Sequence, residues 1–344
     1  MTLRTIRAIF IAASAFAAGA SWAQDAMKQA QEALQRNDIP AAVSILQAAA
    51  NKGDTRAQGL LSDVLLNSPP PTQDPPRACK LANVVAEAGD ARGEAVSAQC
   101  LLMGVVRDTQ ALQHARELAR ASMQLGDAAG AYMLYVAFLI DPANSYLRDG
   151  KPDIKAYSAL ASRPLSARAD QVEAFDALGF AATRGHDKAV LSLATFFYET
   201  VAPNNVARLR DVIGALRKNG ESSPALLQFQ QRAGQIVAAG NTKVSVKAFA
   251  DAYVPTLALA QSADAAKAGG KRCEEVRVAG IDSGDVRDAE FLPLQSPMMK
   301  DTFLVRGSWD EVWTFAGCER STRVLVHFSA DGWGGAVFHS EALP

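Results

Sequence analysis

The chain has 344 residues, a formal net charge of −1 and 49% hydrophobic residues. Basic and acidic side chains are nearly balanced, at 35 and 36, and no long basic run is present. The composition therefore argues against a protein that binds nucleic acid through its charge. The hydrophobic fraction is rich in alanine, which argues against a disordered chain and indicates closely packed helices.

The N-terminal segment 1–23 has the features of a secretory signal peptide. Arg4 and Arg7 precede an apolar run over 8–18, and small residues stand three and one positions before a cleavage point after Ala23. The run is shorter than the roughly 20 residues that cross a bilayer, although an N-terminal membrane anchor is the alternative. We expect cleavage, which lowers the 35 basic side chains to 33 against 36 acidic ones. A periplasmic protein without an integral membrane segment would result.

A glycine follows the alanine-rich end of a helical pattern at five points of the chain. These glycines are Gly53, Gly89, Gly126, Gly185 and Gly220, and the gaps between them are 36, 37, 59 and 35 residues. Three of the four gaps have the length of a helix-pair repeat. The spacing predicts a mainly α chain, with an α/α helical-repeat solenoid over 24–243 in which stacked pairs of helices cover each other's apolar faces.

The turn of each unit has residues that end one helix and begin the next. Glycine ends a helix because it adopts the positive φ of the C′ position. Asp54, Asp90 and Asp127 each follow a glycine, and a short acceptor side chain at this point caps the free N–H groups of the next helix. Apolar residues at helical spacing follow, as over 91–102.

The segment 67–78 contains five prolines, which predict an extended backbone without helix. Such a segment can be a ligand for a partner domain that binds proline-rich peptides. It can also be a loop between two repeats that proline stiffens, and we favour this second interpretation.

Two consecutive stretches resemble the Sel-one-like repeat family, a subclass of tetratricopeptide-like α/α repeats. They are "AAANKGDTRAQGLLSDVLL" and "DPPRACKLANVVAEAGDARGEA", and the resemblance covers about 27–130 and again 170–200. It rests on the Gly-Asp turn between alanines, the Asp-Pro restart at 74–78 and the repeat length. The resemblance implies an adaptor that holds peptides or protein partners in a concave groove. The chain departs from the family in lacking most of the tyrosines and second glycines of the second helix, and an insertion or a decayed unit lies near 141–153.

The composition changes towards the C-terminus. The segment 244–272 is interpreted as an apolar helix that caps the solenoid, followed by an Ala/Lys/Gly linker over 261–272. Beyond it, apolar and other residues alternate over 324–328 with the period of a strand. The glycine-rich stretch 329–335 then predicts the turn of a hairpin. The sequence thus predicts a small β-rich domain, linked by a disulfide, over 273–344.

Three of the chain's four tryptophans, Trp309, Trp313 and Trp333, lie in this domain. The motif W-x-E-x-W-x-x-x-x-C over 309–318, with F-x-x-D-x-x-G-G over 328–335, is similar to C-terminal modules of uncharacterised exported proteobacterial proteins. This resemblance implies no known activity. The tryptophans are a possible binding surface, because tryptophan anchors ligands well. Alternatively, a domain of about 70 residues uses its aromatic side chains for its own small core, helped by a disulfide.

The four cysteines, Cys79, Cys100, Cys273 and Cys318, are candidates for disulfides. An even number of cysteines in an exported chain indicates pairing, and proximity in the sequence favours Cys79–Cys100 and Cys273–Cys318. The closely spaced cysteine pairs that hold zinc are absent. We expect no metal and no cofactor.

Residues that could carry catalysis are few. His327 and His339 fall on adjacent predicted strands, and with Glu311 and Asp331 they are the candidates if the chain is an enzyme or an enzyme subunit with its site in the C-terminal domain. Motifs of zinc proteases, calcium-binding loops and nucleophile elbows are absent from the sequence. We therefore assign no catalytic residue.

The favoured interpretation is a non-enzymatic, exported adaptor that binds a protein partner in the cell envelope. It needs an open groove with apolar patches. One alternative is a module that binds cell-wall glycan, which needs at least two exposed, roughly coplanar tryptophans. The enzyme alternative needs His327 and His339 to cluster with carboxylates in a cleft.

Overall fold

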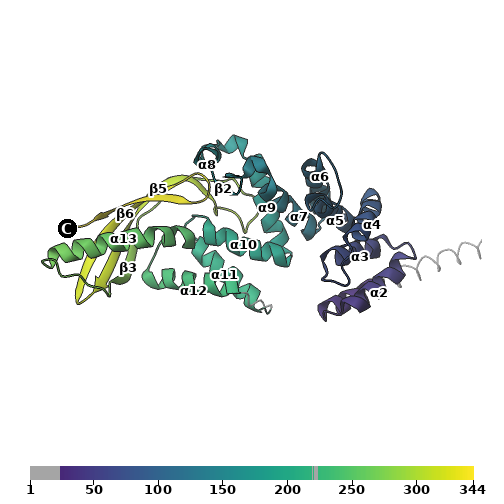
Figure 1. Cartoon of the computed structure of the whole chain (residues 1–344), viewed down its shortest axis with the longest axis horizontal. Coiled ribbons are helices and arrows are strands. Elements are labelled where there is room, and N and C mark those ends of the chain that lie inside the picture. Colours follow the sequence, from purple (N-terminus) through teal and green to yellow (C-terminus); the bar gives the residue numbers. More distant parts are fainter. Residues whose placement is uncertain (1–23, 219, 221–223) are drawn as a thin grey trace, which may run out of the picture. The chain divides into compact units, whose positions relative to one another are not determined.

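The computed structural model of the chain describes residues 24–218, 220 and 224–344 (Figure 1). The expected signal peptide, 1–23, lies outside the described residues. Helices follow one another as far as Lys267, interrupted by one short hairpin, and an antiparallel sheet comes after them. This arrangement confirms the expected fold class of helical repeats followed by a small β-rich part. The chain divides into two compact units, with the boundary between Ala137 and Phe138.

The first unit consists of stacked helix pairs. Residues 24–35 are helical, and the following helices are α2 (Ile39–Ala50), α3 (Thr55–Asn67), α4 (Pro75–Glu87), α5 (Ala91–Leu102), α6 (Ala111–Gln124) and α7 (Ala128–Ile140), which crosses the boundary between the units. From α2 to α6 each helix packs against the next, and α3 also packs against α5. The core between the helices is rich in alanine, so their axes can approach closely.

Aspartates begin the helices at intervals of one repeat. The carboxylates of Asp54, Asp90 and Asp127 accept hydrogen bonds from the backbone N–H three residues further on, at 3.1, 2.8 and 3.2 Å. These three predicted caps are therefore confirmed. Asp38 and Asp74 cap α2 and α4 in the same way, and they are 36 residues apart, as are Asp54 and Asp90.

The five glycines that mark the repeat also have the predicted conformation. They are Gly53, Gly89, Gly126, Gly185 and Gly220, with φ angles of 86°, 77°, 92°, 75° and 86°. A side chain with a Cβ is strained in this region of φ, so the glycines end the helices as expected.

The proline-rich segment differs in part from its prediction. α4 begins at Pro75, and Pro76 lies within its first turn. Proline is tolerated there because the first N–H groups of a helix have no partner within the helix. The prediction of a segment without helix is therefore wrong at its C-terminal end, and residues 68–74 form the loop between α3 and α4.

An inserted element explains the long 59-residue gap between Gly126 and Gly185. After α7 the chain forms a short hairpin of β1 (Leu147–Arg148) and β2 (Lys151–Pro152), followed by α8 (Ile154–Ala161). The repeat pattern then resumes with α9 (Ala169–Thr183) and α10 (Asp187–Glu199).

The second unit continues with helices that lead to the sheet. α11 (Asn205–Lys218) packs against α10, and α12 (Pro224–Ala239) packs against α11. α13 (Val246–Lys267) follows. The helix predicted near 244–260 is thus longer than expected, and it occupies most of the stretch interpreted as a linker.

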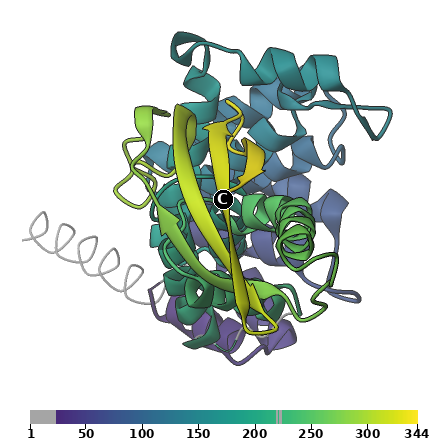
Figure 2. The ribbon, with the colours of Figure 1, turned by 90° about the vertical axis from the view of Figure 1, so that its left-hand side faces the viewer.

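The sheet is antiparallel, with the strand order β3-β5-β6-β7. Its strands are β3 (Arg277–Ser283), β4 (Arg287–Phe291), β5 (Leu304–Gly317), β6 (Arg320–Ala330) and β7 (Ala336–Ala342), and β4 pairs with the part of β5 that β3 leaves free. β6 and β7 form the predicted hairpin, in which Ala330 pairs with Ala336 across the glycine-rich turn. Figure 2 shows α13 lying beside the long strands.

One face of the sheet packs against α13 and forms the core of this part of the chain. α13 contacts β6 and β7, and Val324, Val326 and Phe328 are buried on the strand between the outward-facing Leu325 and His327. The predicted alternation of β6 is thereby confirmed. The helix and the sheet share one hydrophobic core.

Both favoured disulfides are present. Cys79–Cys100 joins α4 to α5, and Cys273–Cys318 joins the segment before β3 to the turn between β5 and β6. Among the helices that the structure describes, none combines the length and the apolar character that crossing a bilayer requires.

Candidate functional site

The motif W-x-E-x-W is a buried hydrogen-bonding unit on β5. Trp309, Glu311 and Trp313 alternate with outward-facing residues, so all three side chains point to the face covered by α13, and all three are fully buried. The two indole N–H groups donate to the Glu311 carboxylate, at 3.1 Å from Trp309 Nε1 to Oε1 and 2.9 Å from Trp313 Nε1 to Oε2. Because buried polar groups need partners, the spacing of the motif satisfies the carboxylate and both indoles.

Glu311 also fixes the connection between α12 and α13. Its carboxylate accepts hydrogen bonds from the Thr242 hydroxyl at 2.8 Å and from the Lys243 backbone N–H at 2.9 Å. The backbone N–H of Asn241 donates to the Ile281 carbonyl on β3, at 3.1 Å. The end of α12 and the start of α13 are therefore attached to the sheet.

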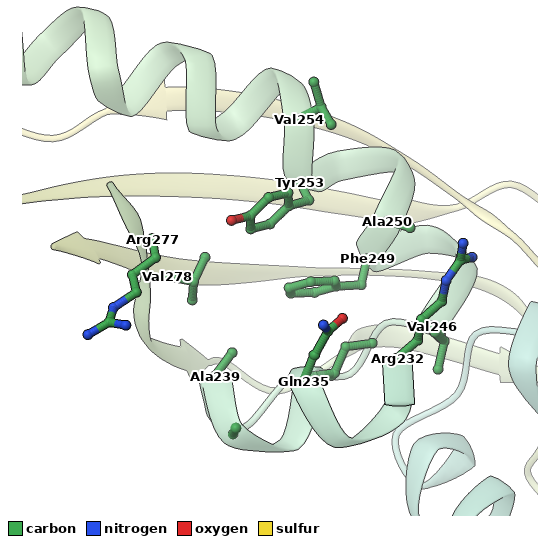
Figure 3. A pocket seen from close by; sticks show the side chains of 12 residues that line it. Arg232, Gln235, Ala239, Val246, Phe249, Ala250, Tyr253, Val254, Arg277 and Val278 are labelled. Carbon is green, nitrogen blue, oxygen red and sulfur yellow. The ribbon is translucent and has the colours of Figure 1, made fainter. Parts of the chain in front are cut away.

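These attachments leave a groove between α12, α13 and β3 (Figure 3). The groove has a volume of about 800 Å³, within the range of small-molecule and cofactor sites. Its lining is mainly apolar, from Ile236, Ala238, Ala239, Val246, Phe249, Ala250, Val254 and Val278, with Tyr253, Gln235, Arg232 and Arg277 as the polar members.

The floor of the groove is attached to the buried motif. Phe249 stacks on Trp313, with ring centroids 4.8 Å apart and an angle of 25° between the rings. Tyr253, one turn further along α13, lies with its ring centroid 5.8 Å from that of Phe249. The hydrogen bond from Trp313 to Glu311 holds the indole on which Phe249 rests, so the position of the floor depends on the sheet.

The two charged side chains that line the groove, Arg232 and Arg277, are both cations. Figure 3 shows the rings of Phe249 and Tyr253 between Arg277, at the start of β3, and Arg232, on α12. The Arg232 guanidinium donates a hydrogen bond to the Tyr198 hydroxyl. In the part of the chain that the structure describes, neither arginine forms an ion pair, and no carboxylate lines the groove.

The second motif, F-x-x-D-x-x-G-G, shapes the turn between β6 and β7. The Asp331 carboxylate accepts hydrogen bonds from the backbone N–H groups of Trp333 and Gly335, at 2.7 and 2.9 Å, and from the Tyr157 hydroxyl of α8. The fully buried Arg168 donates to the Gly332 carbonyl at 2.7 Å, and its guanidinium lies 6.0 Å from the centre of the Trp333 ring. The motif therefore fastens the hairpin to the helices of its own unit.

The predicted tryptophan surface does not exist as a single patch. Trp309 and Trp313 have no exposed area and belong to the core, as the alternative interpretation expects, and only Trp333 is half-buried at the turn. The two exposed, coplanar tryptophans that a glycan-binding surface needs are not found among these three side chains.

The four candidate residues for catalysis fall in three places. His327 and His339 are paired across β6 and β7, with rings 6.5 Å apart and nearly parallel. Glu311 points to the opposite face of the sheet, and Asp331 holds the turn. The histidines are on the solvent-facing side, and neither lines the groove described above.

His327 does have acidic neighbours. Its Nδ1 lies 2.6 Å from Asp310 Oδ1, and the hydrogen bond to Asp310 raises the pKa of His327, with a weaker effect of Glu341. Arg287 donates to the other Asp310 oxygen at 2.8 Å and lowers the pKa of that carboxyl group, with His327 contributing. Within the described chain no group of three or more histidine, cysteine or acidic side chains is arranged to hold a metal ion.

Comparison with protein-family models, with curated proteins and with solved structures gives no match to this chain. The resemblance to Sel-one-like repeats therefore remains an expectation from the sequence.

The residues of the groove were not predicted from the sequence. One signal was present, because Phe249 and Tyr253 stand four residues apart on the predicted apolar helix and so share a face. Arg232 and Arg277 are 45 residues apart, and nothing in the local sequence brings them to one site.

Proposed function

We propose that the chain is a non-enzymatic adaptor that binds a protein partner in the cell envelope. The observation that carries the proposal is the groove of the second unit, which has an apolar and aromatic floor and two cations without acidic partners. Sites that recognise peptides commonly combine an apolar groove with a few polar groups that set orientation.

The helical repeats of the first unit agree with this role. Repeat proteins present extended surfaces built from successive units, and they use them to bind other proteins. The two disulfides support export, because such bonds persist in oxidising compartments such as the periplasm. The proposal places one partner segment in the groove and leaves the repeats for further contacts.

The test is a selection of peptides from a random display library with the full chain as bait. Recovered peptides are then titrated against the chain by fluorescence anisotropy. We expect at least one peptide with a Kd below about 100 μM, which corresponds to a free energy of about −5.5 kcal/mol.

Two tryptophan substitutions on α12 locate the binding. Gln235 lines the groove, so Gln235→Trp fills it and should weaken binding at least tenfold. Val237 is exposed on the same helix but does not line the groove, so Val237→Trp should leave the Kd within about twofold. Failure to recover any binding peptide would contradict the proposed adaptor function. If Gln235→Trp bound the recovered peptides as tightly as Val237→Trp does, the groove would be excluded as the binding site.

A further inference from the structure

We propose that the groove selects an acidic peptide segment, in which apolar residues are flanked on both sides by carboxylates. This inference rests on the proposed function. It follows from three observations: the charges that line the groove, their placement around the aromatic floor, and the absence of an ion pair with either arginine among the described residues.

The charged side chains that line the groove all have the same sign. The protein has more acidic than basic side chains, 36 against 35, yet the groove is lined by two arginines and no carboxylate. Glu274 and Glu275 precede Arg277 in the sequence, but neither forms an ion pair with it in the described chain.

A second cavity provides a comparison. It has a volume of about 510 Å³ among α9, α10, α11 and Met298, and it is lined by one acid and one base, Asp187 and Lys188. Its charges therefore balance, whereas those of the groove do not. Of these two cavities, the groove is the one that is complementary to an anion.

The two cations lie on different elements with the floor between them. Arg232 comes from α12 and Arg277 from the first residue of β3, and Figure 3 shows the rings of Phe249 and Tyr253 between the two. A ligand that crosses the groove therefore meets a cation, an aromatic surface and a second cation. Guanidinium groups bind carboxylates in a two-pronged geometry, so a carboxylate fits at each end and apolar side chains fit in the centre.

This order of groups favours a peptide over a fatty acid or another amphiphile with one head group. A single head group can pair with only one of the arginines, and its tail would cover the other. A segment with an acidic residue on each side of its apolar centre uses both. The requirement for both arginines is thus the property that distinguishes the two ligand classes.

The experiment measures binding of the full chain to three blocked, fluorescein-labelled pentapeptides by anisotropy. Their sequences are Glu-Leu-Phe-Leu-Glu, Gln-Leu-Phe-Leu-Gln and Lys-Leu-Phe-Leu-Lys. We expect the acidic peptide to bind about tenfold more tightly than the neutral one and the basic peptide to bind most weakly. Because both arginines are exposed, salt should screen the preference, and it should shrink between 50 mM and 500 mM NaCl.

Charge reversal at each end of the groove provides the decisive comparison. Arg232→Glu and Arg277→Glu should each weaken the acidic peptide about fivefold, and the double variant should reverse the order of the acidic and basic peptides. Arg210→Glu is the matched control, because Arg210 is exposed on α11 and does not line the groove. It should leave the Kd of the acidic peptide unchanged.

The outcomes separate this inference from the proposed function. Equal binding of the acidic and neutral peptides, with loss of both in Gln235→Trp, would overturn the acidic selectivity and leave the adaptor intact. If only one of the two arginine substitutions weakened peptide binding, and laurate bound in a way that depended on the same arginine, the natural ligand would be an amphiphile and not a peptide. Binding of none of the three pentapeptides, while peptides from the display library do bind, would also overturn the selectivity.

Discussion

Replacement of Glu311 by glutamine should destabilise the second unit strongly, although the two side chains have nearly the same shape. The carboxylate accepts hydrogen bonds from Trp309, Trp313, Thr242 and the backbone of Lys243. A glutamine has one acceptor oxygen, and its amide nitrogen must face at least one of these donors. In the least harmful orientation the amide nitrogen faces Trp313 and that hydrogen bond is lost.

The magnitude follows from the number and type of these bonds. A hydrogen bond to a charged group contributes about 1.5–3 kcal/mol, and a bond to a neutral acceptor contributes about half as much. At the low end of these ranges, loss of one bond and weakening of the other three sum to about 4 kcal/mol. A neutral amide costs less to bury than a carboxylate, so we expect a net decrease of about 3 kcal/mol in the free energy of unfolding. With an m-value of about 2–3 kcal/mol/M, the midpoint in urea should fall by about 1 M.

The assay is urea unfolding followed by tryptophan fluorescence. In a chain that begins at Gln24, the tryptophans are Trp309, Trp313 and Trp333, and all three lie in the second unit. Glu275→Gln is the control, because it removes the same charge from an exposed side chain and should change stability by less than about 0.5 kcal/mol. If the midpoint of Glu311→Gln lay within about 0.2 M of the control, the hydrogen bonds of the Glu311 carboxylate would not stabilise the second unit as argued.

Three further changes test other parts of the structure. Replacing Cys273 and Cys318 by serine should cost the second unit about 4 kcal/mol, from the loop entropy of a separation of 45 residues, measured by urea unfolding with and without reductant. Burial raises the pKa of Glu94, with Asp90 adding to the effect. The folded chain therefore disfavours the charged carboxylate, and the free energy of unfolding falls as the pH rises from about 4.3, the pKa in the unfolded chain, through the raised pKa of the folded one. Glu94→Gln should therefore gain about 1 kcal/mol over wild type at pH 7.5 and almost nothing at pH 4; an equal gain at both values would contradict this origin. Gly93→Ala should lower the melting temperature despite the better helix propensity of alanine, because an added Cβ would lie 2.5 Å from a side-chain carbon of α4; an unchanged or higher temperature would show that the two helices separate easily.

The repeat architecture could be predicted because its determinants are local. The glycine with positive φ and the aspartate that caps the next helix are adjacent residues, so their pairing recurs visibly along the chain. The disulfides could be predicted for a related reason, since each joins cysteines within one structural region. The proline segment shows the limit of this approach, because proline allows a helix to begin at Pro75 as readily as it prevents one from continuing.

The groove could not be predicted because it depends on distant contacts. The hydrogen bond between Thr242 and Glu311 joins residues 69 positions apart, and it determines where α13 begins relative to the sheet. The sequence did indicate that Trp309 and Trp313 belong together. It did not reveal that Glu311 between them faces inward, or that Phe249 rests on Trp313.

The ion pairs of Arg92 restrict which insertions and deletions the helical repeats can accept. Its guanidinium bonds to Asp63 of α3 at 2.6 Å and to Asp127, the cap of α7, at 2.8 Å, so one side chain on α5 connects three successive layers. An insertion or deletion within a layer would misalign these contacts and the caps together. A duplication or loss of one whole unit of about 36 residues would keep every remaining cap in register, so in this part of the protein growth and shortening are expected to proceed by complete helix pairs.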